Sequence, residues 1–411
     1  MAPIKPFKIS VPESSIQTLK TKLSLTTFPQ EVDMSDSWAY GAPLKDIKRL
    51  ATYWQDGFDW RAAESQLNEQ LPQFTTTISV PDGFGDIDVH FVHQRSESED
   101  SIPLLFCHGW PGSFLEVVKI LPLLTKASGQ QDQPSFHVVA PSLPNFGFSG
   151  KVTKPGFGPI QYAQVCHALM LQLGYDKYVT QGGDWGYAIT RSMGIQYPEH
   201  VLASHLNLVL TFKPPTLTGN PTEFIKHAVL PYSEAEKEGI KRTEWFRSEG
   251  MGYNLEQSTR PHTLGFGLAD SPVALLAWVY EKLHDWTDGY PWTDDEVLTW
   301  ISIYAYSTAG PDSSVRIYYE ERKQGSVASG NNKYNDKVLL GLSYFPRDLL
   351  LPPNSWGRTL GPVVFEKRHE DGGHFAAYER PEKLVDDLRT MFGKGGGAEG
   401  VAKKLKAQPG I

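Results

Sequence analysis

The sequence is poor in cysteine, with only Cys107 and Cys166 in 411 residues. Two cysteines in so long a chain do not form a disulfide framework, which favours a reducing compartment and two small buried hydrophobic side chains. The spacing of cysteine and histidine does not match a zinc site, and the sequence has no phosphate-binding glycine loop. We therefore expect neither a metal nor another cofactor.

Long apolar runs and basic clusters are also missing. No apolar stretch reaches the roughly 18 residues of a membrane span, and the N-terminal MAPIKPFKIS lacks the apolar core of a signal peptide. The net charge is -8, and no basic cluster is longer than KKLK near the C-terminus, which argues against nucleic acid as a partner. These features predict a cytoplasmic protein without a membrane span.

Residues 1–95 predict helical hairpins followed by a strand. Ile16, Leu19 and Leu23 recur at helical spacing, and the segment FDWRAAESQLNEQLPQF continues in the same manner. Because this arm is too thin to hold a core of its own, we expect it to wrap around a larger body.

From Ile102 onward, short apolar runs alternate with helical segments. The predicted strands are Ile102–Cys107, FHVVAPSLP, KYVTQGG, LASHLNLV, KVLLGLSYFP and GPVVFEKR. Continuous apolar strands separated by helices predict a mostly parallel sheet covered on both faces, an α/β fold. The predicted parts are a core in 96–212 and 321–392, an inserted helical lid in 213–320 and a flexible tail in 393–411.

The segment VTQGGDWGY places Asp184 between glycines where a predicted strand meets a helix. An aspartate in such a loop is often a turn former or a helix cap. The same position also suits a nucleophile on a sharp turn above the carboxyl edge of the sheet. This residue alone leaves both interpretations open.

A second loop, HGWPGS at residues 108–113, follows the strand that ends at Cys107. Its backbone N–H groups lie at the same predicted sheet edge, so Trp110 together with Trp185 could form an oxyanion hole. The alternative is a simple tight turn in which His108 bonds only to backbone.

The segments HEDGGHFAAYERPE and SYFPRDLLLPP supply a histidine and a carboxylate. His374 is favoured as a base over His369, because the preceding glycines let the loop carry it over the sheet edge. Asp348 could orient its imidazole, or could pair with Arg347 instead. The order Asp184, Asp348, His374 is the nucleophile–acid–base order of α/β-hydrolases.

A serine hydrolase is disfavoured, because the chain contains no G-x-S-x-G. The nearest segment, FGFSGK, contains Ser149 without the required spacing to the following glycine.

Taken together, these motifs resemble those of the microsomal-type epoxide hydrolases, in particular soluble fungal members, over nearly the whole chain. The segments that carry the resemblance are FDWRAAESQLNEQLPQF, DIDVHFVHQRS, HGWPGSFLEV, PSLPNFGFS, GGDWG, GYNLEQSTRPHTLGFGLADSPVALLAWVYEKLHDWTD, YFPRDL and DGGHFAAYERPE. The hydrophobic N-terminal anchor that is common in this family is missing from the sequence, consistent with a soluble enzyme.

The resemblance implies an aspartate nucleophile at Asp184, a histidine base at His374 and its acidic partner at Asp348. It also implies two lid tyrosines that donate hydrogen bonds to the epoxide oxygen. The motif GYNLEQSTRP selects Tyr253, and SSVRIYYE selects Tyr318, with the neighbouring Tyr319 as the alternative. The implied oxyanion donors are again Trp110 and Trp185. The expected partners are a small hydrophobic epoxide and water, and a homodimer is possible in this family.

Two other functions stay open on the sequence. A haloalkane dehalogenase also uses an aspartate nucleophile in this fold, with Trp185 as a halide donor. A protein of this fold without catalysis, acting as a binding module, would be expected to lack part of the site.

Overall fold

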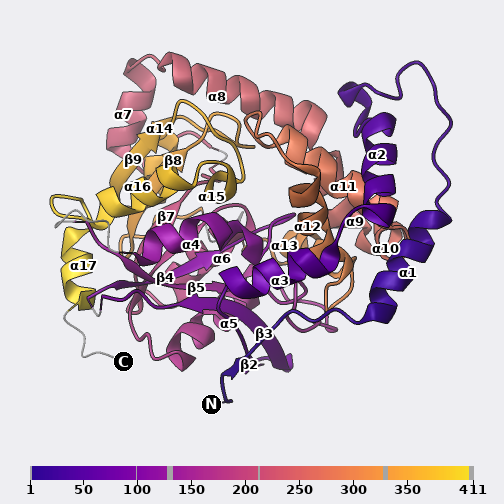
Figure 1. The fold of residues 1–411 in the computed structure, drawn as a ribbon. Coiled ribbons are helices and arrows are strands. Elements are labelled where there is room, and N and C mark those ends of the chain that lie inside the picture. Colours follow the sequence, from indigo (N-terminus) through magenta and orange to yellow (C-terminus); the bar gives the residue numbers. More distant parts are fainter. Residues whose placement is uncertain (1, 99, 127–132, 212, 327–331, 407–411) are drawn as a thin grey trace.

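A mixed nine-stranded β-sheet forms the centre of the molecule (Figure 1). The computed structural model describes residues 2–98, 100–126, 133–211, 213–326 and 332–406. The strands are β1 (Lys5–Pro6), β2 (Gln73–Val80), β3 (Gly85–Gln94), β4 (Ile102–Cys107), β5 (Phe136–Pro141), β6 (Tyr178–Gly182), β7 (Val201–Leu206), β8 (Leu339–Tyr344) and β9 (Val363–Arg368). Their order in the sheet is β1-β2-β3-β5-β4-β6-β7-β8-β9.

The strands from β5 to β9 pair in parallel, whereas β1, β2 and β3 form an antiparallel edge that joins β5. Every residue of β4, β5 and β6 is buried, as expected for strands with helices on both faces. The predicted α/β fold and its parallel core strands are therefore confirmed, with boundaries that differ by only a few residues.

Helices cover both faces of this sheet. They are α4 (Val117–Thr125), α5 (Pro159–Gln172), α6 (Trp185–Gln196), α14 (Asn354–Gly357), α15 (Ala376–Glu379), α16 (Pro381–Phe392) and α17 (Glu399–Lys406). The connection from β4 through α4 to β5 runs along the sheet in the opposite direction to the connection from β6 through α6 to β7. Because parallel crossovers are right-handed, α4 and α6 lie on opposite faces.

A block of helices lies between β7 and β8 in the chain. It contains α7 (Pro221–Val229), α8 (Glu234–Trp245), α9 (Gly252–Thr259), α10 (Pro261–Asp270), α11 (Pro272–Asp285), α12 (Asp294–Ala305) and α13 (Arg316–Gln324). Along the whole described chain, the short 3-10 or π turns are η1 (Trp38–Tyr40), η2 (Phe114–Glu116), η3 (Phe246–Gly250), η4 (Ser313–Val315) and η6 (Arg358–Leu360); of these, η3 and η4 belong to the helical block. Pro261 and Pro272 each stand at the first position of a helix, where the missing N–H costs nothing, and so divide this block into separate helices.

The N-terminal arm packs against this helical block. Its helices are α1 (Glu13–Ser24), α2 (Leu44–Asp56) and α3 (Trp60–Gln70). Both α1 and α2 contact α11, and α2 and α3 contact α12 (Figure 1). Arg49 pairs with Asp294, and the Tyr53 hydroxyl donates to Asp295 at 2.9 Å. The larger body on which the arm lies thus includes the helices above the sheet.

The predicted flexible tail is wrong for the part that the structure describes. Residues Glu399–Lys406 form α17, which contacts α16 and β4. Ala398, Ala402 and Leu405 are buried at spacings of four and three residues, so one apolar stripe faces the core. The glycines of GKGGGAEG end one helix and allow the chain to turn into the next. Residues 407–411 of the predicted tail lie outside the described residues.

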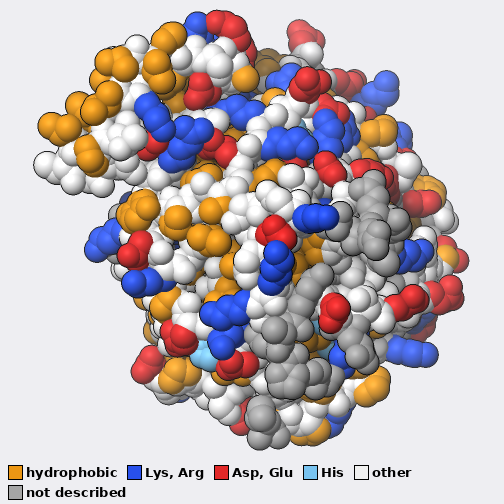
Figure 2. Space-filling model, turned by 90° about the vertical axis from the view of Figure 1, so that its left-hand side faces the viewer, with side chains coloured by type: hydrophobic (Ala, Val, Ile, Leu, Met, Phe, Trp, Pro, Cys, Tyr) orange, Lys and Arg blue, Asp and Glu red, His pale blue; other side chains and the backbone are white. Residues whose placement is uncertain are grey.

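The surface mixes both charge signs with one apolar projection. Figure 2 shows acidic and basic side chains interspersed, with hydrophobic side chains gathered at its upper edge, toward the part of the molecule where α7 lies. Ile225, Val229 and Leu230 of this region are exposed. Within the described residues, no single helix has the length and apolarity of a membrane span, although α10 and α11 meet that criterion as a pair bent by 114°.

The packing of α17 predicts a specific loss of stability. Ala402 is 3% exposed, so Ala402→Asp would bury a carboxylate without a partner and should lower the free energy of unfolding by about 2–4 kcal/mol. Urea unfolding followed by tryptophan fluorescence measures this change. The matched control is Lys404→Asp on the exposed face of the same helix, which should change stability by less than about 0.5 kcal/mol. Equal stabilities for the two variants would contradict the packing.

Candidate active site

Asp184 stands on a strained turn between β6 and α6. Its φ is 50° and its ψ is -127°, an unusual conformation for a residue with a side chain. Gly186 allows this turn, because a Cβ there would lie 1.9 Å from the carbonyl oxygen of Cys107. The turn holds the carboxylate of Asp184 at the carboxyl end of the parallel strands, where α/β sheets place their sites.

The loop after β4 contacts this carboxylate directly. The backbone N–H of Trp110 donates to Oδ1 of Asp184 at 2.8 Å. Gly109 permits the approach, because a Cβ at that position would lie 2.2 Å from the same oxygen. Trp185 is the first residue of α6, so its N–H has no acceptor within the helix and stays the predicted second donor.

His374 lies between two carboxylates. Its Nε2 is 3.2 Å from Oδ2 of Asp184, and its Nδ1 is 2.7 Å from Oδ1 of Asp348. The backbone N–H of His374 donates to the carbonyl of Trp286 at 2.7 Å, which fixes the loop against the end of α11. The three residues selected from the sequence therefore meet in space, although Asp348 lies four residues beyond the end of β8.

The electrostatics of this triad favour an imidazolium. Burial by itself lowers the pKa of His374, but the negative charge of Asp348 and the hydrogen bonds and charge of Asp184 raise it to about 10. Oδ2 of Asp348 is buried with no hydrogen-bond partner among the described residues, whereas its Oδ1 lies 2.7 Å from Nδ1 of the imidazole. In the free protein, His374 is thus a cation placed between the side chains of Asp184 and Asp348.

Aromatic side chains from the helical block enclose the carboxylate of Asp184. Tyr253 on α9 stacks on Trp110 with ring centroids 5.3 Å apart, and its ring lies 5.1 Å from that of Trp286. Tyr318 on α13 lies edge-on to Trp185 at 4.7 Å and to Tyr253 at 5.7 Å. The walls of the site are therefore apolar, and two phenol groups belong to them.

The two tyrosine hydroxyls are buried next to negative charge. Burial raises the pKa of Tyr253, and Asp184 raises it further. Burial also raises the pKa of Tyr318, with added contributions from Tyr253 and Asp184. The Tyr318 hydroxyl makes no hydrogen bond of ordinary geometry with any described residue. Both groups consequently stay protonated at neutral pH and can donate to an oxygen in the site.

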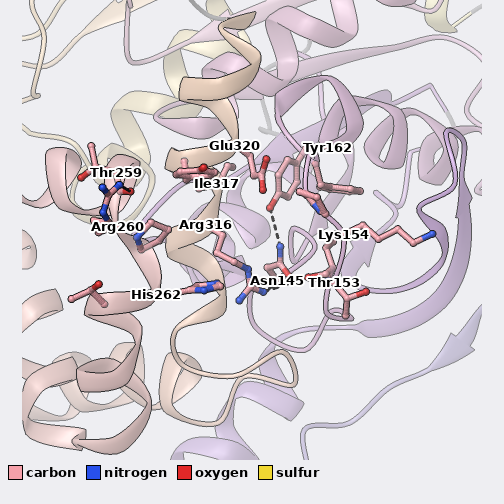
Figure 3. A pocket seen from close by; sticks show the side chains of 16 residues that line it. Asn145, Thr153, Lys154, Tyr162, Thr259, Arg260, His262, Arg316, Ile317 and Glu320 are labelled. Carbon is pink, nitrogen blue, oxygen red and sulfur yellow. Dashed lines mark hydrogen bonds between the residues drawn. The ribbon is translucent and has the colours of Figure 1, made fainter.

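Tyr319 faces elsewhere. It lines a cavity of about 480 Å3 between the core and the helical block, shown in Figure 3, and its ring lies 5.3 Å from the Lys323 ammonium. Neither Asp184 nor His374 lines this cavity. Of the two adjacent tyrosines that the sequence left open, Tyr318 is the one beside Asp184.

Two further carboxylates belong to the site, and sequence reasoning missed both. Glu379 accepts from the N–H of Gly373 at 2.9 Å and from the N–H of Asp288 at 3.0 Å, which ties the His374 loop to the segment after α11. Burial raises the pKa of Glu379 to about 7. Glu116 at the start of α4 is electrostatically coupled to His374 and Asp184. Glu116 lies in the segment HGWPGSFLEV and Glu379 in DGGHFAAYERPE, but nothing in either segment marks these carboxyl groups as part of the site, so the fold reveals them.

The other histidines considered have structural partners. Nε2 of His108 accepts from the Leu143 N–H, and Nδ1 of His108 donates to the carbonyl of Gly109, so His108 supports the turn. Burial lowers the pKa of His108 to about 4. His369 is buried against Asp387, with Nε2 at 2.6 Å from Oδ2, and stacks on Phe345. Within the described residues, no group of three His, Cys, Asp or Glu side chains could hold a metal ion.

Two family models match this chain. Residues 4–117 match the epoxide hydrolase N terminus, and residues 102–229 match the alpha/beta hydrolase fold. The first match covers the N-terminal arm and the Trp110 loop, and the second covers the core strands with Asp184.

Individual proteins match over nearly the full length. A protein of Stigmatella aurantiaca that carries the name epoxide hydrolase is 39% identical, with 95% of this chain and 84% of the relative covered. Epoxide hydrolase 1 of Sus scrofa is 35% identical over 95% of this chain and 88% of its own length. The structure of the Aspergillus niger epoxide hydrolase superposes with a TM-score of 0.81, 35% identity and coverage of 94% and 95%. The structure of the juvenile hormone epoxide hydrolase of Bombyx mori superposes with a TM-score of 0.85 and 28% identity, covering 99% of this chain and 96% of its own.

The charge arrangement makes a prediction for His374 that needs no substrate. In Asp184→Asn the side chain keeps its shape but loses its charge, so one of the two causes that raise the pKa of His374 is removed. Nitrogen NMR should show the doubly protonated imidazolium at pH 8 in the wild type and a much lower titration point in the variant. Identical titration curves would show that Asp184 does not govern this proton. The matched control is Asp371→Asn, which changes an exposed carboxylate of the same loop.

Proposed function

Because this chain belongs to the epoxide hydrolase family of the α/β-hydrolases, its reaction is the hydrolysis of an epoxide, and we propose that it forms a vicinal diol through an ester on Asp184. The observation that carries this mechanism is the position of Asp184, held by the Trp110 N–H and His374 beneath Tyr253 and Tyr318. The proposed nucleophile, base, acid and two proton donors thus come together around the carboxylate of Asp184.

In the first step, Asp184 attacks a ring carbon of the epoxide. A carboxylate is ionised at neutral pH and needs no base for this attack. The C–O bond that breaks leaves an alkoxide, which takes a proton from Tyr253 or Tyr318. Serine would be a poor replacement, because its product would be a stable ether without a carbonyl for water to attack.

In the second step, His374 removes a proton from water, and the water oxygen attacks the carbonyl carbon of the ester. Esterification has by then removed the charge of Asp184, so the pKa of His374 falls. The imidazolium can therefore give its proton to the tyrosine that protonated the alkoxide, which leaves His374 neutral and able to act as a base. Trp110 and Trp185 N–H groups stabilise the oxyanion, and Asp348 keeps the imidazole oriented. The tetrahedral intermediate then collapses by cleavage of its acyl–oxygen bond, and the imidazolium gives a proton to the leaving oxygen. The diol departs, and the new carboxylic acid of Asp184 returns a proton to His374, which restores the carboxylate and the imidazolium.

The substrate class follows from the walls of the site. Trp110, Trp185 and Trp286 surround the reacting groups together with the two tyrosine rings, and each of these side chains is mainly apolar. We propose a small hydrophobic epoxide as the substrate. The relatives from pig and silkworm named above support the reaction class but do not define the substrate of this chain.

The two other functions considered have less support. A haloalkane dehalogenase has no use for two buried phenol hydroxyls above the nucleophile, and the relatives compared over the whole chain are named epoxide hydrolases. A binding module without catalysis is disfavoured because no member of the proposed catalytic set is missing.

The covalent ester can be observed directly. His374→Gln should still be alkylated, since the first step needs only Asp184 and a proton donor, but hydrolysis of the ester should slow by at least about 100-fold. Intact-mass spectrometry after incubation with styrene oxide should then show an increase equal to the mass of one epoxide. Asp184→Asn is the control and should give no adduct. A folded His374→Gln variant that forms no adduct with any of a panel of epoxides would contradict the mechanism.

The roles of the adjacent tyrosines can be separated by the same conservative change. Tyr318→Phe should lower kcat/KM by about 5- to 150-fold, equivalent to about 1–3 kcal/mol, the scale of a hydrogen bond to a charged group. Tyr319→Phe should leave kcat/KM within about twofold, because its ring lines the other cavity. Steady-state kinetics on one epoxide measures both. Equal losses in the two variants would contradict the assignment of Tyr318.

A further inference from the structure

Glu116 places an additional carboxyl group at the Asp184 site. It is the last residue of η2, directly before α4, and the residue as a whole is half-buried while its carboxyl end is enclosed. The N–H groups of Ser113 and Gly109 hydrogen-bond to this carboxyl group. Gly109 is next in sequence to Trp110, whose N–H holds Asp184. The loop HGWPG therefore binds two carboxyl groups through the N–H groups of adjacent residues, Asp184 through Trp110 and Glu116 through Gly109.

The backbone of this loop is shaped for Glu116. A Cβ on Gly112 would lie 1.9 Å from Oε1 of Glu116, so only glycine leaves room for the carboxyl group. The helical block fixes the loop from the other side, because the Tyr304 hydroxyl donates to the carbonyl of Gly112 at 2.5 Å and Trp300 Nε1 donates to the carbonyl of Pro111 at 2.6 Å. The position of Glu116 is thus held by the same contacts that position the oxyanion donor.

Glu116 interacts electrostatically with His374 and Asp184 of the proposed reaction, and also with Tyr304 and Cys107. Burial raises the pKa of Tyr304, and Glu116 raises it further. Burial, opposed by His374 and reinforced by Asp184, raises the pKa of Glu116 to about 8. Esterification of Asp184 removes the charge that reinforces this shift, and transfer of the His374 proton removes the charge that opposes it.

We propose that Glu116 is a positioning residue for the hydrolytic water, a role that rests on the proposed two-step mechanism. In the ester intermediate, the water donates one O–H to Nε2 of His374 and the other to an oxygen of the Glu116 carboxyl group. His374 takes the first proton while the water oxygen bonds to the ester carbon, and Glu116 neither gains nor loses a proton. Two fixed acceptors orient the lone pair of the water toward the carbonyl carbon, which one acceptor alone would not do.

The alternative is that Glu116 only braces the loop. A brace would serve both chemical steps, because Trp110 and Asp184 depend on the same loop from the first step onward. A group that positions water serves only the second step. The two roles are therefore separated by the ratio of the alkylation rate to the hydrolysis rate.

The test compares wild type with Glu116→Gln in rapid-mixing, single-turnover reactions with styrene oxide, quenched for intact-mass analysis. Alkylation should stay within about threefold of wild type, whereas decay of the ester should slow by about 10- to 100-fold. The ester on Asp184 should consequently accumulate when substrate is in excess. Gly112→Ala is the second variant, because its methyl group displaces the Glu116 carboxyl without changing its chemistry, and it should show the same selective loss.

Glu366→Gln is the matched control, because burial raises the pKa of this carboxyl group as well, but it pairs with Arg358 away from the site. It should leave both rates unchanged. The inference is overturned if Glu116→Gln hydrolyses its ester at the wild-type rate, or if both steps slow in proportion. A failure of His374→Gln to form any adduct would instead overturn the proposed mechanism, so the two failures are distinguishable.

Discussion

The site depends on one buried cation between a buried carboxylate, Asp348, and a half-buried one, Asp184. Removing a carboxylate from water is costly, and His374 lies within hydrogen-bond distance of both. Because the pKa of His374 is raised to about 10, its imidazole is protonated in the free protein and is not yet available as a base. In the proposed mechanism, esterification neutralises Asp184 and so lowers the pKa of His374. The proposed first step would thereby prepare the second.

The fold brings these groups together by close backbone approach. Strands β4 and β6 are neighbours in the sheet, so the loop that contains Trp110 and the turn that contains Asp184 leave the same edge side by side. Gly109 and Gly186 remove the side chains that would separate them. The strain at Asp184 persists because the turn is fixed by the strand before it, the helix after it and the carbonyl of Cys107 beside it.

Features that depend on residues close together in the chain can be predicted from the sequence, whereas features that depend on tertiary packing cannot. The strands were predictable because each is a continuous apolar run, and Asp184, Asp348 and His374 were predictable because their order along the chain is that of the fold. The helix α17 was missed because its apolar stripe is short and follows a run of glycines. Tyr318 and Tyr319 are adjacent and chemically identical, so only their direction on α13 distinguishes them. Glu116 bonds to N–H groups of its own loop, and Glu379 joins the His374 loop to the segment after α11; no spacing in the sequence shows that these loops lie together at the site.

The apolar walls have a chemical role besides recognition. Burial raises the pKa of Tyr253 and Tyr318, so neither phenol ionises beside Asp184 at neutral pH. Both therefore keep the proton that the leaving oxygen would need in the proposed mechanism. The Tyr318 hydroxyl has no partner of ordinary geometry among the described residues, and an unpaired buried hydroxyl destabilises the fold. A substrate oxygen that accepts from this group relieves that cost most strongly when the oxygen is negatively charged. The stabilisation is then greatest as the ring opens, which is the condition for catalysis rather than for tight binding of the epoxide.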